Sequence, residues 1–303
     1  MSAAVRKARK KEWGVARDKR RTGMLFVGIP MLLFLLFSVY PLLFATYLSF
    51  TNFTFTQPPT FVGLTNFARL LQDKVFHIAI LNTVLYTVGV VPVGVALSLA
   101  AALLLNQKIR GITIFRTAYY MPVVTSAVAS GMIWLWLYAP SAGLINQALE
   151  FLGLPPQKWL LDPRLALISV MIMAVWKNLG YTMVIFLAAL QGIPTHLYES
   201  AELDGANGWH KVRSITLPLI RPATFFVFVT AMISSFQVFG SVFVMTKGGP
   251  GYATTTIVLQ VYLNAFRYMR MGYASAQALV LFAIIFTLAL FNWRFLRSDV
   301  EVW

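Results

Sequence analysis

One lysine lies where a charge is costly. Lys177 is near the middle of an apolar run, residues 165–190, and is followed by Asn178 and Tyr181. A lysine at the centre of a bilayer costs at least about 2.5 kcal/mol on insertion scales, so its ammonium group must face water or a partner. Two interpretations stay open: a solute-pathway residue, or a buried lysine bonded to backbone carbonyls or to a partner subunit. Asn178 and Tyr181 are three residues apart and share a helix face.

A polar insert interrupts a second apolar run, residues 223–246. Its members are Ser234, Ser235, Phe236, Gln237 and Gly240. Phe236 and Gly240 are four residues apart and share a face. These side chains are candidates for contact with a solute, but small and polar residues also join neighbouring helices within a membrane. The sequence alone does not separate the two uses.

Residues for acid–base or metal chemistry are missing from the apolar runs. All ten acids and two of the three histidines lie outside them, and the third, His77, is at the very start of the second run. Carriers driven by protons or sodium usually keep such groups inside the bilayer. The chain also has no Cys and no Gly-Lys dipeptide, so thiolate and phosphate-loop chemistry are not expected. We therefore expect no catalytic residue and no metal site, and any energy for transport must come from another polypeptide.

The elements that must position these residues are membrane spans. Of the 303 residues, 58% are hydrophobic and only 12% are charged, whereas a soluble domain carries about 25% charged residues. Runs of about 18 apolar residues are long enough to cross a bilayer as helices. The predicted fold class is all-α, a polytopic membrane protein with six transmembrane helices. The expected spans are 24–49, 76–105, 117–139, 165–190, 223–246 and 273–296.

Lysine and arginine set the predicted orientation. The first 23 residues carry nine bases against two acids, and should form a solvated tail that contacts anionic lipid. With this tail inside the cell, the inner segments hold 17 of the 25 bases and the outer loops hold seven. Inner segments normally carry the excess, so both termini are expected in the cytoplasm. Because topology explains the net charge of +15, no nucleic-acid partner is expected.

A long polar segment, residues 194–222, separates the fourth and fifth spans on the predicted inner side. We expect Thr195 to cap a short helix that contains Glu199 and Glu202, and Gly205 to end it in the left-handed conformation. A second short helix should begin near Asn207 and stop by Pro218. The segment is therefore predicted to be a helix–turn–helix elbow.

The elbow resembles the EAA motif, E-A-A-x3-G-x9-I-x-L-P, of permease subunits of binding-protein-dependent ABC importers. The departures are Ser200, which replaces the middle alanine, and Val212, which stands where many members carry Phe. Stretches elsewhere are similar to the carbohydrate-uptake branch, the maltose and glycerol-phosphate type. They are FVGLTNF at 61–67, GLIN at 143–146, GGP at 248–250 and GYASA at 272–276.

The resemblance implies a type I importer permease fold in a bacterial or archaeal plasma (inner) membrane. It implies a basic tail at 1–23, a permease domain at 24–297 and, within it, a coupling loop at 194–222. The implied partners are a second homologous permease, two ATPase subunits and an extracytoplasmic solute-binding protein. ATP and Mg would be bound by the partner ATPase, which leaves this chain without a cofactor. The implied cargo is a sugar or sugar-like solute.

The resemblance also implies two groups of site residues. The ATPase-coupling group comprises Glu199, Ser200, Ala201, Asp204, Gly205, Ala206, Ile215, Leu217 and Pro218. The solute-pathway group comprises Lys177, Asn178, Tyr181, Ser234, Ser235, Phe236, Gln237 and Gly240. The alternative is a self-contained secondary transporter, which explains neither the elbow nor the acid-free spans.

Overall fold

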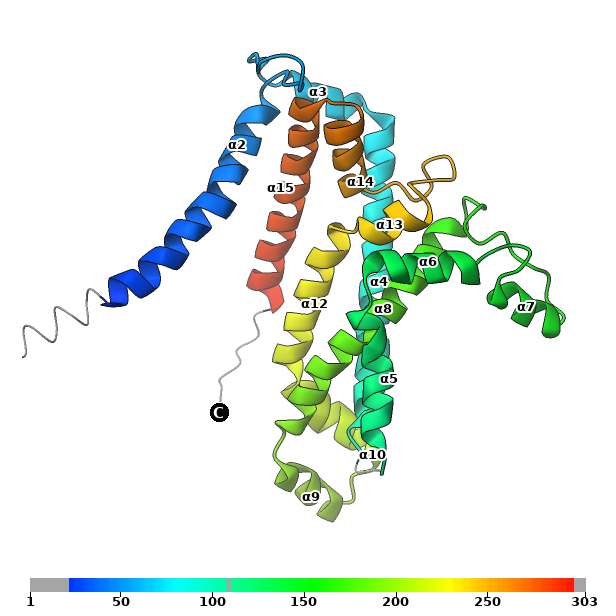
Figure 1. Cartoon of the computed structure of the whole chain (residues 1–303). Coiled ribbons are helices and arrows are strands. Elements are labelled where there is room, and N and C mark those ends of the chain that lie inside the picture. Colours follow the sequence, from blue (N-terminus) through cyan, green and yellow to red (C-terminus); the bar gives the residue numbers. More distant parts are fainter. Residues whose placement is uncertain (1–21, 108–109, 297–303) are drawn as a thin grey trace, which may run out of the picture.

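The chain folds into an upright bundle of helices with a short helical elbow at one end (Figure 1). A computed structural model describes residues 22–107 and 110–296. The basic tail up to residue 21, Lys108 and Arg297 lie outside the described residues, as do the side chain of Trp293 and the four acids nearest the termini. Within the described part no strand forms, and only two isolated bridges link residues of the 51–61 loop.

The helices follow one another with short connections. They are, in chain order, η1 (Leu35–Val39), α2 (Tyr40–Ser49), α3 (Thr65–Gln72), α4 (Lys74–Leu105), α5 (Ile112–Val124), α6 (Ala127–Leu137), α7 (Leu144–Phe151), α8 (Ala166–Gln191), α9 (Thr195–Leu203), α10 (Gly208–Lys211), η2 (Val212–Thr216), α11 (Leu217–Leu219), α12 (Arg221–Phe236), α13 (Gly240–Met245), α14 (Ile257–Tyr262), η3 (Leu263–Arg267) and α15 (Met271–Leu296). The three η segments are single π-helical turns.

Four described helices are long and apolar enough to cross a bilayer: Thr22–Ser49, α4, α8 and the Met271–Asn292 part of α15. Two bent helix pairs raise the number to six if each pair is one span. The chain is therefore a multi-pass membrane protein. The pairs are α5 with α6, and the segment Gly208–Leu219 with α12.

The expectation of one continuous helix over 117–139 is corrected by the structure. α5 and α6 meet at an angle of 101°. Between them Thr125 and Ser126 adopt extended backbone, with ψ of 145° and 151°. Ser126 Oγ accepts a hydrogen bond from the Ala129 amide at 3.1 Å and so caps the start of α6. Pro122, with Ser126 four residues later as a possible cap, was the sequence signal for this break.

The expected helix over 223–246 is also interrupted, at its polar insert. α12 ends at Phe236, and the amides of Gln237 and Val238 bond back to the Ser234 and Ser235 carbonyls at 3.2 Å. These shorter-range bonds tighten the last turn and end the helix. α13 begins only at Gly240. The insert is therefore a bend near the middle of the bundle.

The pair formed by α4 and α8 is the centre of the bundle. Ser98 of α4 donates its hydroxyl hydrogen to the Leu179 carbonyl of α8 at 3.1 Å. On another face of α8, Gly180 lies so close to α5 that an added Cβ would stand 2.1 Å from the Tyr119 carbonyl oxygen. Only glycine fits this crossing. α8 contributes to an apolar cluster in each half of the bundle, one around Val170 and one around Phe186.

The first helix, Thr22–Ser49, leans away from the rest of the bundle (Figure 1). None of its most apolar 18-residue stretch is buried. It contacts α15 through α2, near the end that carries Ser49. The remaining apolar surface of this helix is left for lipid or for another subunit to cover.

Three asparagines fasten loops of the bundle, each by donating to two carbonyls. Asn66 binds the carbonyls of Ser49 and Thr51, and Asn82 binds those of Tyr252 and Thr255. The third asparagine, Asn146, binds two carbonyls of the loop around α7. A buried carbonyl without a donor costs free energy, so each amide holds its loop in one conformation. Asn66 and Asn146 are the asparagines of the FVGLTNF and GLIN stretches.

Candidate functional site

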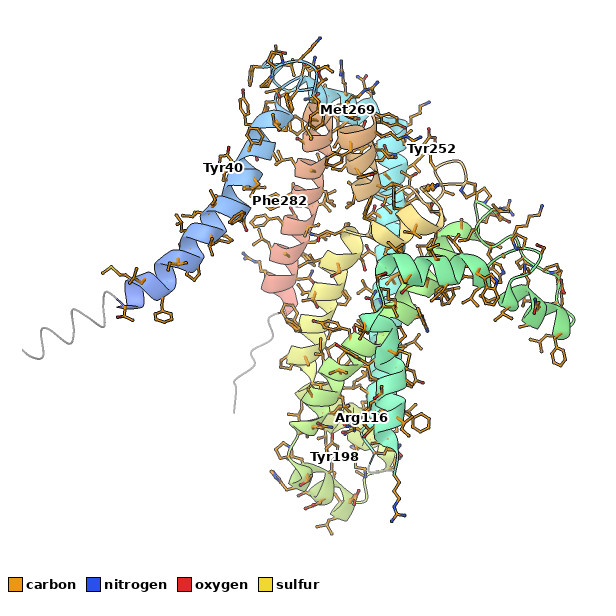
Figure 2. The ribbon with its side chains drawn as sticks, in the orientation of Figure 1. Tyr40, Arg116, Tyr198, Tyr252, Met269 and Phe282 are labelled. Carbon is orange, nitrogen blue, oxygen red and sulfur yellow. The ribbon has the colours of Figure 1, made fainter. Side chains whose placement is uncertain are left out.

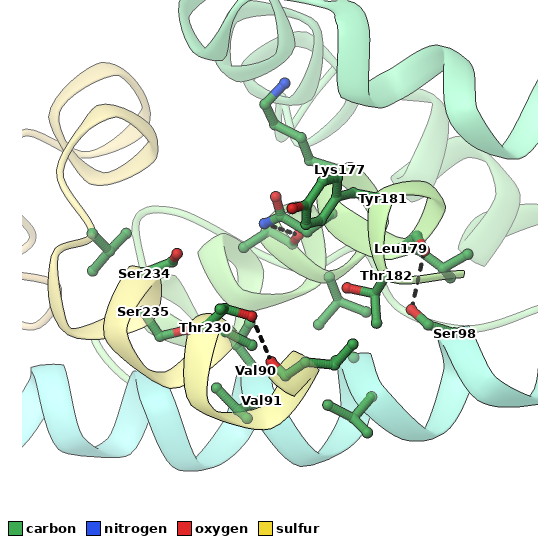
Figure 3. A pocket seen from close by; sticks show the side chains of 18 of the residues that line it. Val90, Val91, Ser98, Lys177, Leu179, Tyr181, Thr182, Thr230, Ser234 and Ser235 are labelled. Carbon is green, nitrogen blue, oxygen red and sulfur yellow. Dashed lines mark hydrogen bonds between the residues drawn. The ribbon is translucent and has the colours of Figure 1, made fainter. Parts of the chain in front are cut away.

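A cavity of about 370 Å³ opens in the middle of the bundle. Its walls come from α4, α8 and α12, with the start of α6 and the bend between α12 and α13 closing it (Figure 3). Six of the eight residues predicted for the solute pathway line it. They are Lys177, Asn178, Tyr181, Ser234, Ser235 and Gly240.

The other two predicted residues, Phe236 and Gln237, do not line this cavity. Phe236 is 6% exposed and packs in the apolar cluster between α4, α12 and α15. Gln237 is exposed at the end of α12. Successive helical residues differ by about 100° in direction, so Phe236 points well away from Ser234. The helix then ends, and Gln237 no longer follows its periodicity.

The Lys177 ammonium group binds the break between α5 and α6. Its Nζ donates to the Thr125 carbonyl at 2.6 Å and to the Pro122 carbonyl at 3.2 Å, and lies 3.5 Å from Ser130 Oγ. Figure 3 shows the side chain extending away from Ser98 and Ser235. The last carbonyls of a helix lack intrahelical partners and carry partial negative charge. Lys177 therefore satisfies the end of α5 with its charged group, while its stem lines the cavity.

Asn178 and Tyr181 are two further polar side chains of α8 that line the cavity. The Asn178 amide donates to the Ala174 carbonyl of its own helix at 2.9 Å. The Tyr181 side chain is 51% exposed. An exposed phenol ring offers a flat apolar face and a hydroxyl, which together suit a polar ring-shaped ligand.

Sequence analysis missed several cavity residues that carry hydroxyl groups. They are Tyr86, Ser98, Thr182, Thr230 and Ser241. Helical spacing was the available signal for two of them. Thr182 follows Asn178 by four residues, and Thr230 precedes Ser234 by four, so each shares a face with a predicted residue. Tyr86 and Ser98 on α4 had no such signal, because only the fold brings α4 beside α8.

The elbow at the foot of the bundle matches the predicted pair of short helices. α9 ends with Gly205 at φ +77°. The amides of Gly205 and Ala206 bond back to the carbonyls of Glu202 and Ala201 at 3.0 and 2.8 Å. This is the Schellman pattern that closes a helix on a left-handed glycine. Asn207 Oδ1 then accepts the His210 amide hydrogen at 2.8 Å and starts α10, as expected.

Two details of the predicted elbow are corrected. Thr195 is the first residue of α9, the cap position is Pro194, and no side chain caps this end. Pro218 does not stop the second helix, because the π-helical turn η2 precedes it and helical backbone continues to Leu219. A widened turn shifts the hydrogen-bond register, which removes the need for an amide on the proline.

The elbow is fixed to the bundle on one side and exposed on the other. Tyr198 and Thr216 share a hydrogen bond between their hydroxyl groups at 2.9 Å, and Ile215 packs against the apolar cluster at the ends of α4 and α8. Tyr198 lies beside the lower end of the bundle in Figure 2. On the free side Leu203 is 91% exposed and Trp209 is 69% exposed. Large apolar side chains at such exposure mark an interaction surface.

The predicted coupling residues divide between these two sides. Glu199, Ser200, Asp204, Gly205 and Leu217 are exposed. The others are partly covered: Ala201, Ala206, Ile215 and Pro218. The sequence therefore builds a rigid elbow with a free face that carries carboxylates beside apolar groups.

Comparison with known protein families places most of this chain in one of them. Residues 94–296 match the inner membrane component of binding-protein-dependent transport systems. The chain belongs to this permease family. The region matched includes most of the residues that line the cavity, the elbow and every helix from α5 onward.

Individual relatives cover almost the whole permease. It is 33% identical over 281 residues to the sn-glycerol-3-phosphate transport system permease protein UgpA of Agrobacterium fabrum, covering 91% of this chain and 95% of the relative. It is 35% identical over 263 residues to the arabinooligosaccharides transport system permease protein AraP of Halalkalibacterium halodurans, covering 86% and 83%.

The fold of the permease is that of a solved importer chain. A chain of a bacterial ABC transporter involved in the import of the acidic polysaccharide alginate superposes with a TM-score of 0.83 at 24% identity, over 95% of this chain and 99% of that chain. The permease therefore has the type I importer permease fold.

Proposed function

We propose that this permease forms half of the translocation pathway of an ABC importer for a sugar or sugar-like solute. It would lie in a bacterial or archaeal plasma membrane with both termini in the cytoplasm. Its partners would be a second permease, two ATPase subunits that bind ATP and Mg, and an external solute-binding protein. The observation that carries the proposal is the rigid elbow with its exposed face.

Chain connectivity supports the elbow as the coupling element. α8 ends at Gln191 only a few residues before α9, and α11 passes directly into α12 through Ile220. α8 and α12 are two walls of the central cavity. A force applied to the elbow therefore acts on both walls without passing through a flexible linker. A shift of this kind is a shear-type transition between two packed arrangements.

The cavity chemistry supports a hydroxylated cargo. Apart from Lys177, whose ammonium group binds the break between α5 and α6, its polar side chains carry hydroxyls and one amide, and it holds the exposed ring of Tyr181 beside them. Hydroxyls and amides both donate and accept hydrogen bonds, as sugar hydroxyls do. The relatives named above are permeases for arabinooligosaccharides and for sn-glycerol 3-phosphate, which agrees with cargo of this class.

The outlying first helix supports a second permease as partner. Helix Thr22–Ser49 extends beyond the bundle with its apolar surface uncovered. A second subunit beside the bundle would cover part of that surface, and lipid would cover the rest.

Charge reversal on the elbow tests the coupling assignment. The permease would be affinity-purified with its native assembly, reconstituted in nanodiscs, and assayed for sugar-stimulated ATP hydrolysis. Glu199→Lys and Gly205→Pro should insert normally and lose the stimulation. A hydrogen bond to a charged group contributes about 1.5–3 kcal/mol. Losing one from Glu199 would therefore weaken the binding of the permease to the ATPase at least about tenfold.

The matched control is Glu150→Lys, an exposed glutamate on α7. It carries the same charge change on a short helix away from the elbow and should keep the stimulation. Full stimulation in Glu199→Lys would remove the coupling role. If the permease alone accumulates a sugar against its gradient in vesicles, the chain is a secondary transporter and the proposal fails.

A further inference from the structure

A second hollow lies at the end of the bundle opposite the elbow. Its volume is about 1110 Å³, and its walls come from α3, the start of α4, the loop before α14, η3 and the start of α15. Figure 2 labels two residues toward this end: Tyr252, which lines the hollow, and Met269, which lies between the lining residues Tyr268 and Arg270 in the chain. We call it the basic hollow after its four cations, Arg69, Lys247, Arg267 and Arg270.

The cations of the basic hollow have no acidic partner among the described residues. The acid in its lining is Asp73, and both of its oxygens are occupied. Oδ1 accepts the amide hydrogens of Val75 and Phe76 at 2.9 and 3.1 Å, and Oδ2 accepts the Tyr273 hydroxyl at 2.6 Å. Within residues 22–107 and 110–296 the one ion pair formed is at the elbow.

The proposed membrane orientation does not explain why these cations lie where they do. In the proposed orientation they face the outside, where lysine and arginine are normally depleted. Four of the seven bases in the outer loops nevertheless surround this one hollow. All four side chains are exposed, and a hollow lined by one sign of charge attracts ions of the opposite sign.

The wall and floor of the basic hollow are held in place. Lys247 and Tyr252 adopt left-handed backbone, with φ of +53° and +71°, a conformation that costs energy for residues with a side chain. The loop that carries them is fastened by Asn82. On the floor, the buried Asn264 amide donates to the Gln260 carbonyl and to Gln277 Oε1 at 3.0 and 3.2 Å.

We propose that the basic hollow binds a sugar that carries a carboxylate or a phosphate, and that such a sugar is the cargo of the importer. Guanidinium groups bind these anions through paired hydrogen bonds. Tyr252 and Tyr268 are each more than half exposed in the hollow and offer flat faces for a sugar ring. The volume of about 1110 Å³ lies just above the usual range of about 300–1,000 Å³ for small-molecule pockets, which leaves room for two or more sugar units. The proposal rests on the sugar-import function above.

Direct binding tests this assignment without nucleotide or partner subunits. The full-length permease, in nanodiscs of phosphatidylcholine, would be titrated with digalacturonate, glucose 6-phosphate, neutral galactobiose and inorganic phosphate. The two acidic sugars should bind saturably, and the neutral disaccharide and inorganic phosphate at least about tenfold more weakly. Because this assay does not use ATP hydrolysis, its failure is distinct from failure of the coupling assignment.

Paired substitutions locate the site. Arg267→Gln with Arg270→Gln should weaken acidic-sugar binding at least about tenfold. The matched control is Lys158→Gln with Arg164→Gln, which removes two exposed outer bases that do not line the hollow and should leave binding unchanged. Arg267→Lys with Arg270→Lys keeps both positive charges but loses the paired hydrogen bonds that a guanidinium group makes, so intermediate affinity is expected. This second pair also keeps the test valid if the glutamine pair does not fold.

Four results would overturn the proposal. Equal binding of galactobiose would remove the role of charge, and equal binding of inorganic phosphate would reduce the hollow to a general anion site. Competition by phosphatidylglycerol added to the nanodiscs would assign the hollow to lipid headgroups. Absence of binding by every probe would indicate that the cations contact an acidic face of the solute-binding protein and do not bind a sugar.

Discussion

Replacing Lys177 by methionine is the sharpest test of how the broken third span is held. Methionine keeps the length of the apolar stem and removes the ammonium group. Of the two carbonyls that Lys177 binds, that of Thr125 then loses this donor, whereas that of Pro122 keeps the Thr125 hydroxyl as a donor at 2.7 Å. Since both lie at the break between α5 and α6, we expect the angle between these helices to become variable.

The size of the effect follows from two opposing terms. A hydrogen bond from a charged group contributes about 1.5–3 kcal/mol, so the two shorter bonds of Lys177 amount to about 4.5 kcal/mol. Removing a lysine from the bilayer regains about 3 kcal/mol on insertion scales. The net destabilisation expected for Lys177→Met is therefore about 1.5 kcal/mol. Lys177→Arg retains donors and should lie closer to the wild type.

Spin-label distances can report the angle directly because the chain has no cysteine. Ile114 on α5 and Met132 on α6 are 74% and 62% exposed, so a cysteine at each position can carry a label. A narrow distance distribution is expected with Lys177 present and a broad one with Lys177→Met. Thermal unfolding in the same detergent would measure the loss of stability.

Two outcomes would refute this reasoning. If Lys177→Met leaves both the distance distribution and the unfolding temperature unchanged, the carbonyl contacts do not hold the break. If it leaves both unchanged and also abolishes sugar-stimulated ATP hydrolysis, Lys177 acts on the solute and not on α5. Loss of order at the break with normal folding elsewhere would support the structural role.

Two further substitutions test the packing around the site. Gly180→Ala places a Cβ against the Tyr119 carbonyl, and should destabilise the permease by about 1–3 kcal/mol, whereas Gly94→Ala enters open space and should be neutral or slightly stabilising in thermal unfolding. Equal effects would refute the close crossing of α5 and α8. Asn82→Ala removes two hydrogen bonds to loop carbonyls, each of which stabilises the loop by about 1 kcal/mol. The rate of proteolysis in the loop before α14 should therefore rise about tenfold or more. Asn178→Ala, whose amide binds only within its own helix, is the control, and an unchanged cleavage rate for Asn82→Ala would show that the loop is fastened by other contacts.

Local chemistry made much of the fold predictable. Long apolar runs gave helices at nearly the expected limits for α4, α8 and α15, because a bilayer leaves backbone groups no partner except their own helix. Gly205 and Asn207 ended and started elbow helices as expected, since turn and cap preferences act over a few residues.

The interrupted spans were harder to predict. The breaks at Ser126 and at Gln237 contain only a few polar residues within long apolar runs, and hydropathy averaged over many residues does not detect a two-residue change of direction. One side chain, Ser126, caps the helix after the first break, and two backbone hydrogen bonds close the last turn of α12 at the second. Such weak local signals are decisive only when neighbouring helices also favour the bend.

The sequence by itself determined that this chain is a membrane-spanning bundle with a helix–turn–helix elbow between two spans, because hydrophobicity and backbone capping are properties of neighbouring residues. The tertiary structure decided which polar groups meet. It turned Lys177 toward the end of α5, placed Phe236 in the core, brought α4 hydroxyls into the cavity and gathered Arg69 with Arg267 and Arg270 around one hollow. These contacts join residues that are far apart along the chain, and only the packing of whole helices sets the distances between them.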